Sequence, residues 1–348
     1  MGWREAAGWL NMVKPLVFVT RKVPSPGVEI LKEYCEVKVW ESEVPPTREE
    51  LVKEIEEVHG IFCMVTDVID GGVMDSAPNL RVVSTMSVGY DHIDVPEATK
   101  RGIYVTNTPG VLTDATADLT WALLLAAARL VVNADRYVRE GGWKGGWSPT
   151  LFLGESVYGK TLGIVGIGRI GSAVALRASG FGMKKLYFDV RRLPKEREEE
   201  LGVEYRPLED LLKGADFVTL HVPLTKETHH MIGEAQLRLM KPSAILVNAS
   251  RGPVVDEAAL VKALREGWIA GAALDVFERE PISPDNPLLK LGNVVLTPHI
   301  GSATKEARSK MAEMAAKNLI SVLKGEAPPN LVNEEVQEVA PLPKVKVI

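Results

Sequence analysis

The stretch Thr161-Leu-Gly-Ile-Val165-Gly166-Ile167-Gly168-Arg169-Ile170-Gly171 decides the fold of this protein. Its apolar part predicts a buried strand, and the helical pattern that follows the last glycine continues to Phe181. In this strand, turn and helix context, the first glycine of G-x-G-x-x-G permits a tight turn, the second lets backbone amides approach a pyrophosphate, and the third lets the helix pack closely on the strand. The stretch therefore predicts a dinucleotide-binding unit.

Three residues downstream of this stretch bear on the choice of coenzyme. Asp189 lies 18 residues beyond Gly171, directly after a predicted strand, where an acid hydrogen-bonds the adenosine ribose. Its carboxylate would repel a 2′-phosphate, which favours NAD(H). Arg191 and Arg192 offer guanidinium groups that bind phosphate well, so the sequence leaves NADP(H) open as a second coenzyme.

Outward from this stretch, short apolar runs alternate with amphipathic segments, a pattern typical of sheets covered by helices. The runs before it are Leu16–Thr20, Val37–Trp40, Ile61–Val65, Val82–Met86 and Tyr104–Thr106. The runs from it onward are Thr161–Val165, Lys185–Phe188, Phe217–Leu220, Ala244–Asn248, Gly271–Leu274 and Val294–Thr297. We predict an α/β chain with two Rossmann-like or flavodoxin-like domains, each a doubly wound parallel sheet, and an active-site cleft between the domains.

The expected domain boundaries follow from these runs. Residues 13–111 together with 300–333 form the predicted substrate-binding domain, and residues 112–299 form the predicted NAD(P)-binding Rossmann domain. The last helix, about Ser302 to Lys324, is expected to return to the first domain because too little sequence follows it to build a core. The proline-rich tail from Pro328 is expected to be loosely attached, and Met1–Met12 to be an appendage.

Two helices are predicted from local signals. Thr47 with Glu50 forms a capping box, in which each residue satisfies an otherwise unpaired amide. Thr113 to Arg139 is rich in Ala and Leu and has no proline or glycine, which predicts one continuous helix. Its apolar residues lie on more than one face, so we expect a homodimer that buries the extra surface.

Composition excludes several classes of protein. Hydrophobic residues make up 46% and charged residues 25% of 348, which disfavours a disordered chain. A net charge of -5 gives no basic excess for nucleic acid. The most apolar run, Trp121 to Val132, is shorter than the roughly 20 residues of a membrane span, so we expect no membrane insertion. Cys35 and Cys63 show no disulfide or thiolate-metal spacing, which favours the cytoplasm. No H-E-x-x-H motif is present, and no bound metal is expected.

Several segments resemble the D-isomer-specific 2-hydroxyacid dehydrogenase family. They are Val88-Gly-Tyr-Asp-His-Ile-Asp94, Asn248-Ala-Ser-Arg-Gly-Pro-Val-Val-Asp256, Ala273-Leu-Asp-Val-Phe-Glu-Arg-Glu-Pro281 and Thr297-Pro-His-Ile-Gly-Ser302. The alanine-rich segment Ala115 to Arg129 is similar to the glyoxylate/hydroxypyruvate reductase branch. The resemblance implies NAD(P)H-dependent reduction of a small 2-oxo acid, glyoxylate or hydroxypyruvate, to glycolate or D-glycerate.

The resemblance also implies three catalytic residues. Hydride transfer to a 2-oxo acid leaves negative charge on the carbonyl oxygen, which needs a proton donor. His299 is expected to supply the proton, and Glu280 to hydrogen-bond the histidine and stabilise its protonated form. Glu278, two residues earlier, is the competing acid. Arg251 is expected to bind the substrate carboxylate with its planar fork of donors and to polarise the keto oxygen.

Further site residues follow from the same resemblance. The expected coenzyme-binding residues are Thr116, Gly166, Gly168, Arg169, Ile170, Gly171, Asp189, Arg191, Arg192, His221, Val222, Pro223, Ala249, Ser250 and Asp275. The expected substrate-binding residues are Met64, Val88, Gly89, Arg251 and Trp147. In the reductase branch, a tryptophan of the loop that contains Trp147 reaches the partner subunit's active site and limits substrate size. Trp143 is the alternative for that role, and both tryptophans can instead pack at the interface.

Other functions compete with this interpretation. The same family includes D-lactate and 3-phosphoglycerate dehydrogenases, which differ in the acid they take. Phosphite dehydrogenase resembles the chain less, because Val88 stands where that enzyme has a lysine. A co-repressor that senses NAD, of the C-terminal-binding-protein type, shares the fold and the three catalytic residues. Turnover of glyoxylate or hydroxypyruvate distinguishes an enzyme from such a sensor.

Overall fold

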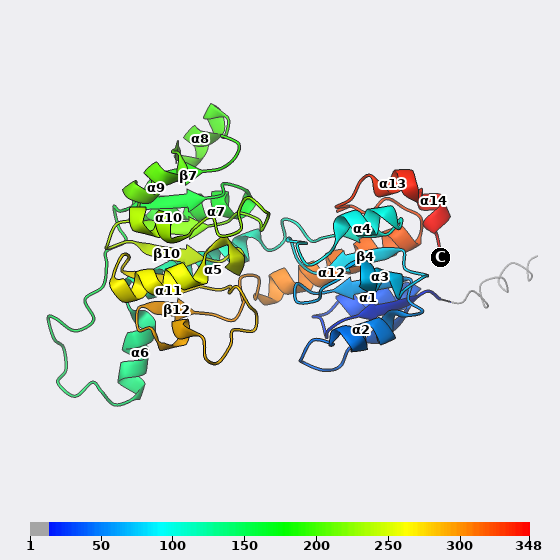
Figure 1. The fold of residues 1–348 in the computed structure, drawn as a ribbon, viewed down its shortest axis with the longest axis horizontal. Coiled ribbons are helices and arrows are strands. Elements are labelled where there is room, and N and C mark those ends of the chain that lie inside the picture. The colour runs from blue at the N-terminus through cyan, green and yellow to red at the C-terminus, as the bar shows by residue number, and fades with distance from the viewer. Residues whose placement is uncertain (1–13) are drawn as a thin grey trace, which may run out of the picture. The chain divides into compact units, whose positions relative to one another are not determined.

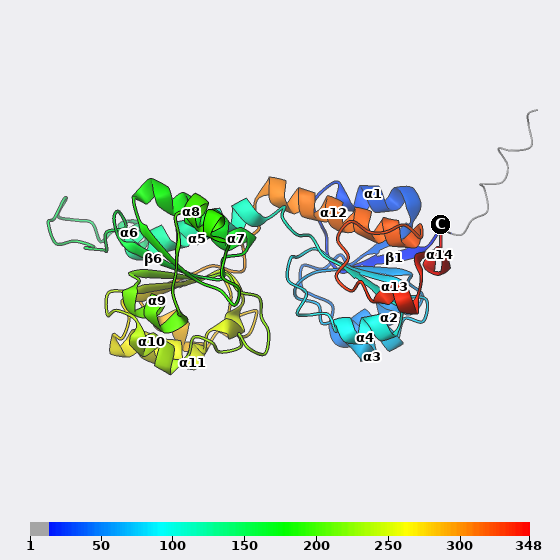
Figure 2. The ribbon, with the colours of Figure 1, turned by 90° about the horizontal axis from the view of Figure 1, so that it is seen from above.

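The computed structural model describes residues 14–348, and the Met1–Met12 appendage lies outside the described residues. The chain divides into two units. Unit 1 contains the described residues up to Leu112 together with Thr304–Ile348, and unit 2 contains Thr113–Ala303 (Figure 1). In each unit a parallel sheet lies between two layers of helices (Figure 2).

The sheet of unit 1 has the flavodoxin-like order β2-β1-β3-β4-β5, and all of its pairs are parallel. Its strands are β1 (Leu16–Val19), β2 (Glu36–Val39), β3 (Gly60–Cys63), β4 (Val82–Thr85) and β5 (Tyr104–Thr106). Every residue of the central strands β3 and β4 is buried, as expected for a sheet covered on both faces.

Helices cover both faces of this sheet. One face carries α1 (Gly27–Tyr34) and α12 (Lys305–Leu323), which pack on each other. The other face carries α2 (Arg48–Ile55), α3 (Gly71–Asp75) and α4 (Val95–Lys100). At the start of α2, Thr47 and Glu50 form the predicted capping box. The last long helix packs on β3 and β4 of unit 1, where the sequence places it.

The C-terminal tail is attached more firmly than the sequence predicts. It forms α13 (Val336–Val339) and α14 (Leu342–Val345), with Val336 and Val345 buried in the core. The Tyr104 hydroxyl donates a hydrogen bond to the Ala340 carbonyl at 2.7 Å. The buried Asn333 side chain accepts from the Val105 amide at 2.8 Å. The expectation of a loose tail is therefore wrong, because the tail satisfies polar groups of β5.

The sheet of unit 2 has the order β12-β11-β10-β9-β6-β7-β8, again with all pairs parallel. Its strands are β6 (Thr161–Val165), β7 (Lys184–Phe188), β8 (Glu204–Tyr205), β9 (Phe217–Leu220), β10 (Ile245–Asn248), β11 (Gly271–Leu274) and β12 (Val294–Leu296). The strand order reverses beside β6, which is where doubly wound sheets bind ligands. The two-residue edge strand β8 is too short to show a periodic signal in the sequence.

Two layers of helices cover the sheet of unit 2 (Figure 2). One contains α5 (Thr113–Ala128) and α7 (Arg169–Ala178), and the other contains α9 (Leu208–Gly214), α10 (Glu234–Leu239) and α11 (Glu257–Glu266). The remaining segments are α6 (Val131–Arg139), α8 (Lys195–Leu201) and the 3-10 turns η1 (Ser179–Phe181), η2 (Gly252–Val254) and η3 (Pro287–Lys290). Trp121 of α5 stacks on Phe181, with ring centroids 4.7 Å apart, which joins α5 to the end of α7.

The prediction of one helix from Thr113 to Arg139 is wrong. The segment breaks into α5 and α6, which meet at 65°. Leu130 at the break is left-handed, with φ of 53°. The chain returns at Gly154, and the Glu155 amide donates a hydrogen bond of 2.7 Å to the Ala128 carbonyl, which would otherwise be unpaired at the helix end. A distant segment thus terminates α5 without any local glycine or proline.

Within residues 14–348, no single helix is both long and apolar enough to cross a membrane, and only the bent pair of α5 and α6 meets that test when the two are counted together.

Candidate functional site

The glycine turn after β6 shows which glycines the chain itself requires. Gly166 has φ of +92°, and a Cβ there would lie 2.8 Å from the carbonyl carbon of His221. A Cβ on Gly171 would lie 2.0 Å from the Gly166 carbonyl oxygen, so the third glycine is needed for packing of α7 on the turn. Gly168, at the start of α7, has nothing within 4 Å of such a Cβ. Open space above helix N-terminal amides suits a pyrophosphate.

Two polar side chains flank this turn. Asp189 follows β7 and accepts hydrogen bonds from the Ile167 amide at 2.8 Å and from the Arg191 amide at 3.3 Å. Its carboxylate is thereby fixed beside the glycine turn. His221 follows β9, and burial lowers its pKa to about 3, which keeps the ring neutral. Within the described part of the chain, neither ring nitrogen of His221 has a hydrogen-bond partner. Such unpaired polar atoms beside an open glycine turn fit a bound dinucleotide.

Other residues predicted to bind coenzyme lie after β6, β9 and β10 at the carboxyl edge of the sheet, either in the turn or at the start of the helix that follows it. They are Arg169, Ile170, Val222, Pro223, Ala249 and Ser250. Thr116, in the first turn of α5, is 5% exposed and lies beside Gly301. Their shared location is the edge at which open α/β sheets bind ligands.

Asp275 holds the turn that carries His299. It is 1% exposed at the end of β11. Its Oδ1 accepts from the Thr297 hydroxyl at 2.6 Å and from the Ile300 amide at 2.8 Å, and its Oδ2 accepts from the Gly301 amide at 2.8 Å. Burial raises the pKa of Asp275, while these donors act in the opposite direction. The carboxylate thus serves the protein's own turn, in addition to its predicted place beside the coenzyme.

His299 is in the left-handed region, with φ of 53°. This conformation is uncommon for a residue with a side chain and persists only where the surroundings enforce it. The His299 amide donates to the Asp275 carbonyl at 2.9 Å, so main chain and side chain of Asp275 together enforce it. The turn fixes the direction of the imidazole.

Glu280 lies beside the histidine ring. Its Oε2 is 2.7 Å from His299 Nδ1, and its Oε1 accepts from the Phe277 amide at 3.1 Å. A carboxylate at Nδ1 places a proton on that nitrogen and leaves Nε2 for a reacting group. The contact is the one that the motif implies, whereas the catalytic roles of both residues stay predictions.

The Arg251 loop packs directly against the Glu280 loop. An added Cβ on Gly252 would lie 1.9 Å from the carbonyl carbon of Phe277, so the two backbones touch. Asn248, at the end of β10, accepts from the Ser250 amide at 3.0 Å and donates to the Arg251 carbonyl at 2.8 Å. The Arg251 guanidinium donates to the Ser250 carbonyl at 3.0 Å. Glycine is therefore required at 252, and the turn that positions Arg251 is fixed by Asn248.

A pair of glutamates ties the same two loops together from the side of α11. The Glu257 amide donates to Glu278 at 3.1 Å, and the Glu278 amide donates to Glu257 at 3.3 Å. Glu278 also lies 2.7 Å from Nε2 of His230. The competing acid Glu278 therefore contacts His230 and α11, and the acid beside His299 is Glu280.

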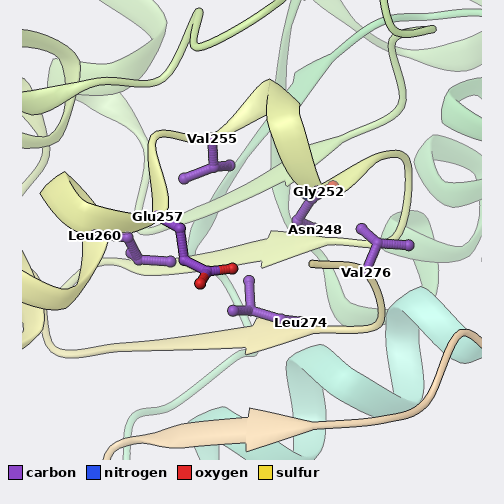
Figure 3. Close-up of a pocket in the computed structure, with 7 residues that line it drawn as sticks. All are labelled: Asn248, Gly252, Val255, Glu257, Leu260, Leu274 and Val276. Atoms are coloured by element: carbon purple, nitrogen blue, oxygen red, sulfur yellow. The ribbon is translucent and has the colours of Figure 1, made fainter. Parts of the chain in front are cut away.

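Figure 3 shows the side chain of Glu257 extending from the start of α11 into a small cavity, toward Leu274. The cavity measures about 10 Å³ and is also lined by Asn248 and Gly252. That volume is about what one water molecule needs. The cavity therefore lies among the residues that support the Arg251 loop, and it is too small for a substrate.

In unit 1, the Val88–Gly89 turn follows β4 and has both carbonyl oxygens occupied. The Asn107 side-chain amide donates to the Val88 carbonyl at 2.8 Å, and the Ser87 hydroxyl donates to the Gly89 carbonyl at 2.6 Å. With both carbonyls bound to the protein, the backbone of this turn is fixed, and the amides of a fixed turn can bind an anion. This geometry fits the predicted binding of a substrate carboxylate.

Met64 follows β3 in the same unit. Its amide donates at 2.7 Å to Asp67, which is 4% exposed and also accepts from the Thr20 hydroxyl at 2.5 Å. Burial raises the pKa of Asp67. The segment after β3 is thus fixed to the end of β1 by one buried carboxylate.

Trp147 lies in the loop between α6 and β6 and is 84% exposed. Trp143 in the same loop is 57% exposed, and its indole N–H donates to the Gly146 carbonyl at 2.6 Å. Within residues 14–348, the structure places neither indole ring against the predicted catalytic residues, so the role of Trp147 stays a prediction.

The residues that support the site are not among those predicted from the sequence. They are Thr20, Asp67, Ser87, Asn107, Asn248, Glu257 and Thr297. Most of them are polar residues within three positions of a strand's carboxyl end. That position, taken alone, is a usable signal, because side chains there meet at the ligand-binding edge of a parallel sheet.

Fold and glycine turn together define a class of dinucleotide-binding α/β dehydrogenases. The family model described as D-isomer specific 2-hydroxyacid dehydrogenase, NAD binding domain, matches residues 121–301. A glyoxylate reductase of Korarchaeum cryptofilum is 62% identical over 330 residues, which cover 94% of this chain and 99% of that protein. A glyoxylate reductase of Thermofilum pendens is 58% identical over 338 residues, which cover 97% and 100%.

Solved structures agree with these relatives. A protein of Thermus thermophilus has a TM-score of 0.86 and 50% identity, with coverage of 91% of this chain and 99% of that one. An NADPH-dependent glyoxylate/hydroxypyruvate reductase from Sinorhizobium meliloti, in complex with NADP and malonate, has a TM-score of 0.82 and 37% identity, with coverage of 93% and 98%. The chain belongs to the D-isomer specific 2-hydroxyacid dehydrogenase family and is an NAD(P)-dependent enzyme.

Proposed function

We propose that this protein reduces glyoxylate, hydroxypyruvate or both to the corresponding 2-hydroxy acids, glycolate and D-glycerate, with NAD(P)H. The observation that carries the proposal is the 2.7 Å contact between His299 Nδ1 and Glu280 Oε2, on a turn that Asp275 enforces. The names of the two glyoxylate reductase relatives support the substrate class.

The chain's own residues perform the proton and binding steps. When bound, the reduced nicotinamide supplies a hydride to the carbonyl carbon of the 2-oxo acid. The Nε2–H of His299 donates a proton to the carbonyl oxygen, and Glu280 stabilises the protonated ring before that transfer. Arg251 binds the substrate carboxylate through its forked donors. The amides of Val88 and Gly89 are proposed as further donors to the substrate carboxylate.

Coenzyme binding is assigned to the glycine turn and its neighbours. The amides at the start of α7 would hold the pyrophosphate, and Asp189 would hold the adenosine ribose. His221 offers unpaired ring nitrogens beside the same turn. Asp275 and Thr116 complete the set near the His299 turn.

A steady-state screen tests the proposal. Glyoxylate, hydroxypyruvate, pyruvate and 3-phosphohydroxypyruvate are each supplied with NADH and with NADPH, and kcat/KM is compared. We expect one of the first two acids to give the highest value. A higher kcat/KM for pyruvate or for the phosphorylated acid would assign the protein to another branch of the family. Absence of turnover with all four acids would favour a coenzyme sensor.

A variant separates catalysis from coenzyme binding. His299→Ala removes the single proton donor, whereas the coenzyme contacts are spread over many residues. We expect the reduction rate to fall by about 100-fold or more, with the Kd for NADH unchanged by fluorescence titration. Parental turnover by this variant would contradict the assigned role.

We further propose that the protein is a homodimer. Val131, Val132 and Val138 of α6 are exposed, and so are Trp143 and Leu153 of the loop that follows. A cavity of about 200 Å³ lies next to these residues, lined by Leu130, Leu153 and the starts of β10, β11 and β12. Exposed apolar side chains on one helix and on the loop that follows it are typical of an interaction site, and a second copy of the chain is the proposed occupant.

The cytoplasm is the proposed location. Cys35 and Cys63 are both buried free thiols, and they belong to clusters on opposite faces of the unit 1 sheet. They do not form a disulfide, which suits a reducing compartment. Cell fractionation with an antibody against the chain tests this location, and recovery outside the cytoplasmic fraction would contradict it.

A further inference from the structure

The loop after β7 contains Asp189, the residue proposed above to bind the adenosine ribose. NADP differs from NAD by a phosphate on the ribose 2′ oxygen, so this loop selects between the two coenzymes. Its sequence, Asp189-Val-Arg191-Arg192-Leu-Pro194, offers one carboxylate and two guanidinium groups. Asp189 is fixed beside the glycine turn by the amides of Ile167 and Arg191. The choice of coenzyme is therefore expected to depend on which of the two arginines is able to bind the 2′-phosphate.

Arg192 is held by a residue outside the loop. Its Nε donates to Glu198 Oε1 at 2.8 Å and its Nη2 donates to Glu198 Oε2 at 3.0 Å, which is a two-point ion pair. The centre of the guanidinium also lies 5.6 Å from the centroid of the Tyr205 ring. Both the edge and the face of the group are thereby engaged.

Glu198 is itself anchored. Its carboxylate accepts a hydrogen bond from the Tyr187 hydroxyl at 2.7 Å, and that hydroxyl oxygen accepts from the Leu193 amide at 2.9 Å. The Glu198 side chain is 11% exposed, whereas Arg192 is 65% exposed. Hydrogen bonds from Arg192 and Tyr187 lower the pKa of Glu198 to about 2, so it is ionised at neutral pH. Arg191 differs from Arg192. Its side chain is exposed, and its contact with Asp189 is made by the main-chain amide.

We propose that Glu198 determines coenzyme specificity by holding Arg192 away from the 2′-phosphate of NADP(H). Arg191 is then the cation that meets such a phosphate, against the repulsion of Asp189. Glu198 does not touch the coenzyme and acts through Arg192. The inference rests on the proposed function only in that a dinucleotide binds at the glycine turn.

Calorimetric titration of the intact protein with two coenzyme fragments tests this inference. The probes are 5′-AMP and 2′,5′-ADP. They differ only in the 2′-phosphate, so the ratio of their Kd values measures the contribution of that phosphate to binding. The variants are Glu198→Gln, Arg191→Ala, Arg192→Ala and the double variant Glu198→Gln/Arg192→Ala. Glutamine keeps the size of Glu198 and can still accept from Tyr187, but it carries no charge for Arg192.

We expect Glu198→Gln to strengthen 2′,5′-ADP relative to 5′-AMP by about fivefold, which is the usual size of a partly exposed charge contact. The double variant should lose this gain, because the released cation is then absent. Arg191→Ala should weaken 2′,5′-ADP by a similar factor, and Arg192→Ala should leave it within about twofold. The kcat/KM ratio for NADPH over NADH should follow the same order.

An unchanged affinity ratio in Glu198→Gln, or a gain that survives in the double variant, would overturn the proposal. If Glu198→Gln does not fold, the comparison of the two alanine variants decides, because equal losses would show that Arg192 is not withheld. Failure to bind either fragment would remove the nucleotide site and this inference with it. Failure of glyoxylate turnover alone bears on the proposed substrate and leaves the fragment measurements valid.

Discussion

At the scale of the residue, Glu280 has both carboxylate oxygens engaged, one with His299 and the other with the Phe277 amide. Its orientation is therefore set before substrate binds, which reduces the reorganisation needed during proton transfer. The neighbouring Glu278 has a comparable charge but contacts His230 and α11. Two acids in the same short loop thus have different neighbours, and they form a matched pair for mutagenesis.

We predict that Glu280→Gln lowers kcat for reduction by about tenfold or more, because a neutral amide no longer stabilises the positive charge of the His299 ring that donates the proton. The measurement is kcat and KM for glyoxylate or hydroxypyruvate reduction at saturating coenzyme. Glu278→Gln is the control and should leave kcat within about twofold of the parent. Parental kcat in Glu280→Gln would contradict the pairing.

At the scale of the element, the turn between β12 and α12 depends on one buried carboxylate. Asp275 accepts three hydrogen bonds from Thr297, Ile300 and Gly301, and it thereby keeps His299 in a left-handed conformation. Because Asp275 directly follows the rigid strand β11, these hydrogen bonds fix the direction of the imidazole. Removal of one acceptor should therefore affect stability and catalysis together.

We predict that Asp275→Asn lowers the free energy of unfolding by about 1 to 3 kcal/mol, because an amide cannot accept from all three donors and leaves a buried N–H unpaired. Urea unfolding followed by circular dichroism measures the loss. Thr297→Val removes one donor and keeps all acceptors, so it should cost less. Equal stability of Asp275→Asn and the parent would show that the turn does not need the carboxylate.

The Val88–Gly89 turn gives a second prediction for a single element. Asn107 of the segment after β5 binds the Val88 carbonyl and so orients the amides of the turn. Asn107→Ala should raise KM for the 2-oxo acid by about fivefold, the value of one hydrogen bond, with a smaller change in kcat. The Kd for NADH should not change. A loss confined to kcat would indicate a role other than positioning of the turn.

At the scale of the whole molecule, the break at Leu130 directs α6 away from the line of α5 and leaves its valines exposed. An isolated chain would keep this apolar surface in water. We predict a homodimer, measured by light scattering at micromolar concentration as twice the mass of the chain. Val138→Asp should favour the monomer, because it places a charge in the apolar surface. A monomeric mass for the parent would rule out the proposed dimer.

Local patterns in the sequence determined much of this protein by themselves. The positions of every strand except β8, the glycine turn and the Thr47–Glu50 capping box depend on neighbouring residues, so alternation and spacing were sufficient to predict them. The resemblance located Glu280, His299 and Arg251 because ordered motifs surround each of them. The branch of the family followed from the same segments.

Tertiary structure alone decided the features that need residues distant in the chain. Leu130 ends α5 because Glu155 binds the Ala128 carbonyl, and the tail is ordered because Asn333 and Ala340 bind β5. Glu198 holds Arg192 because the chain folds α8 back beside β7. Each of these contacts satisfies a polar group from another segment, and a sequence pattern shows which groups are polar but not which distant partner satisfies them.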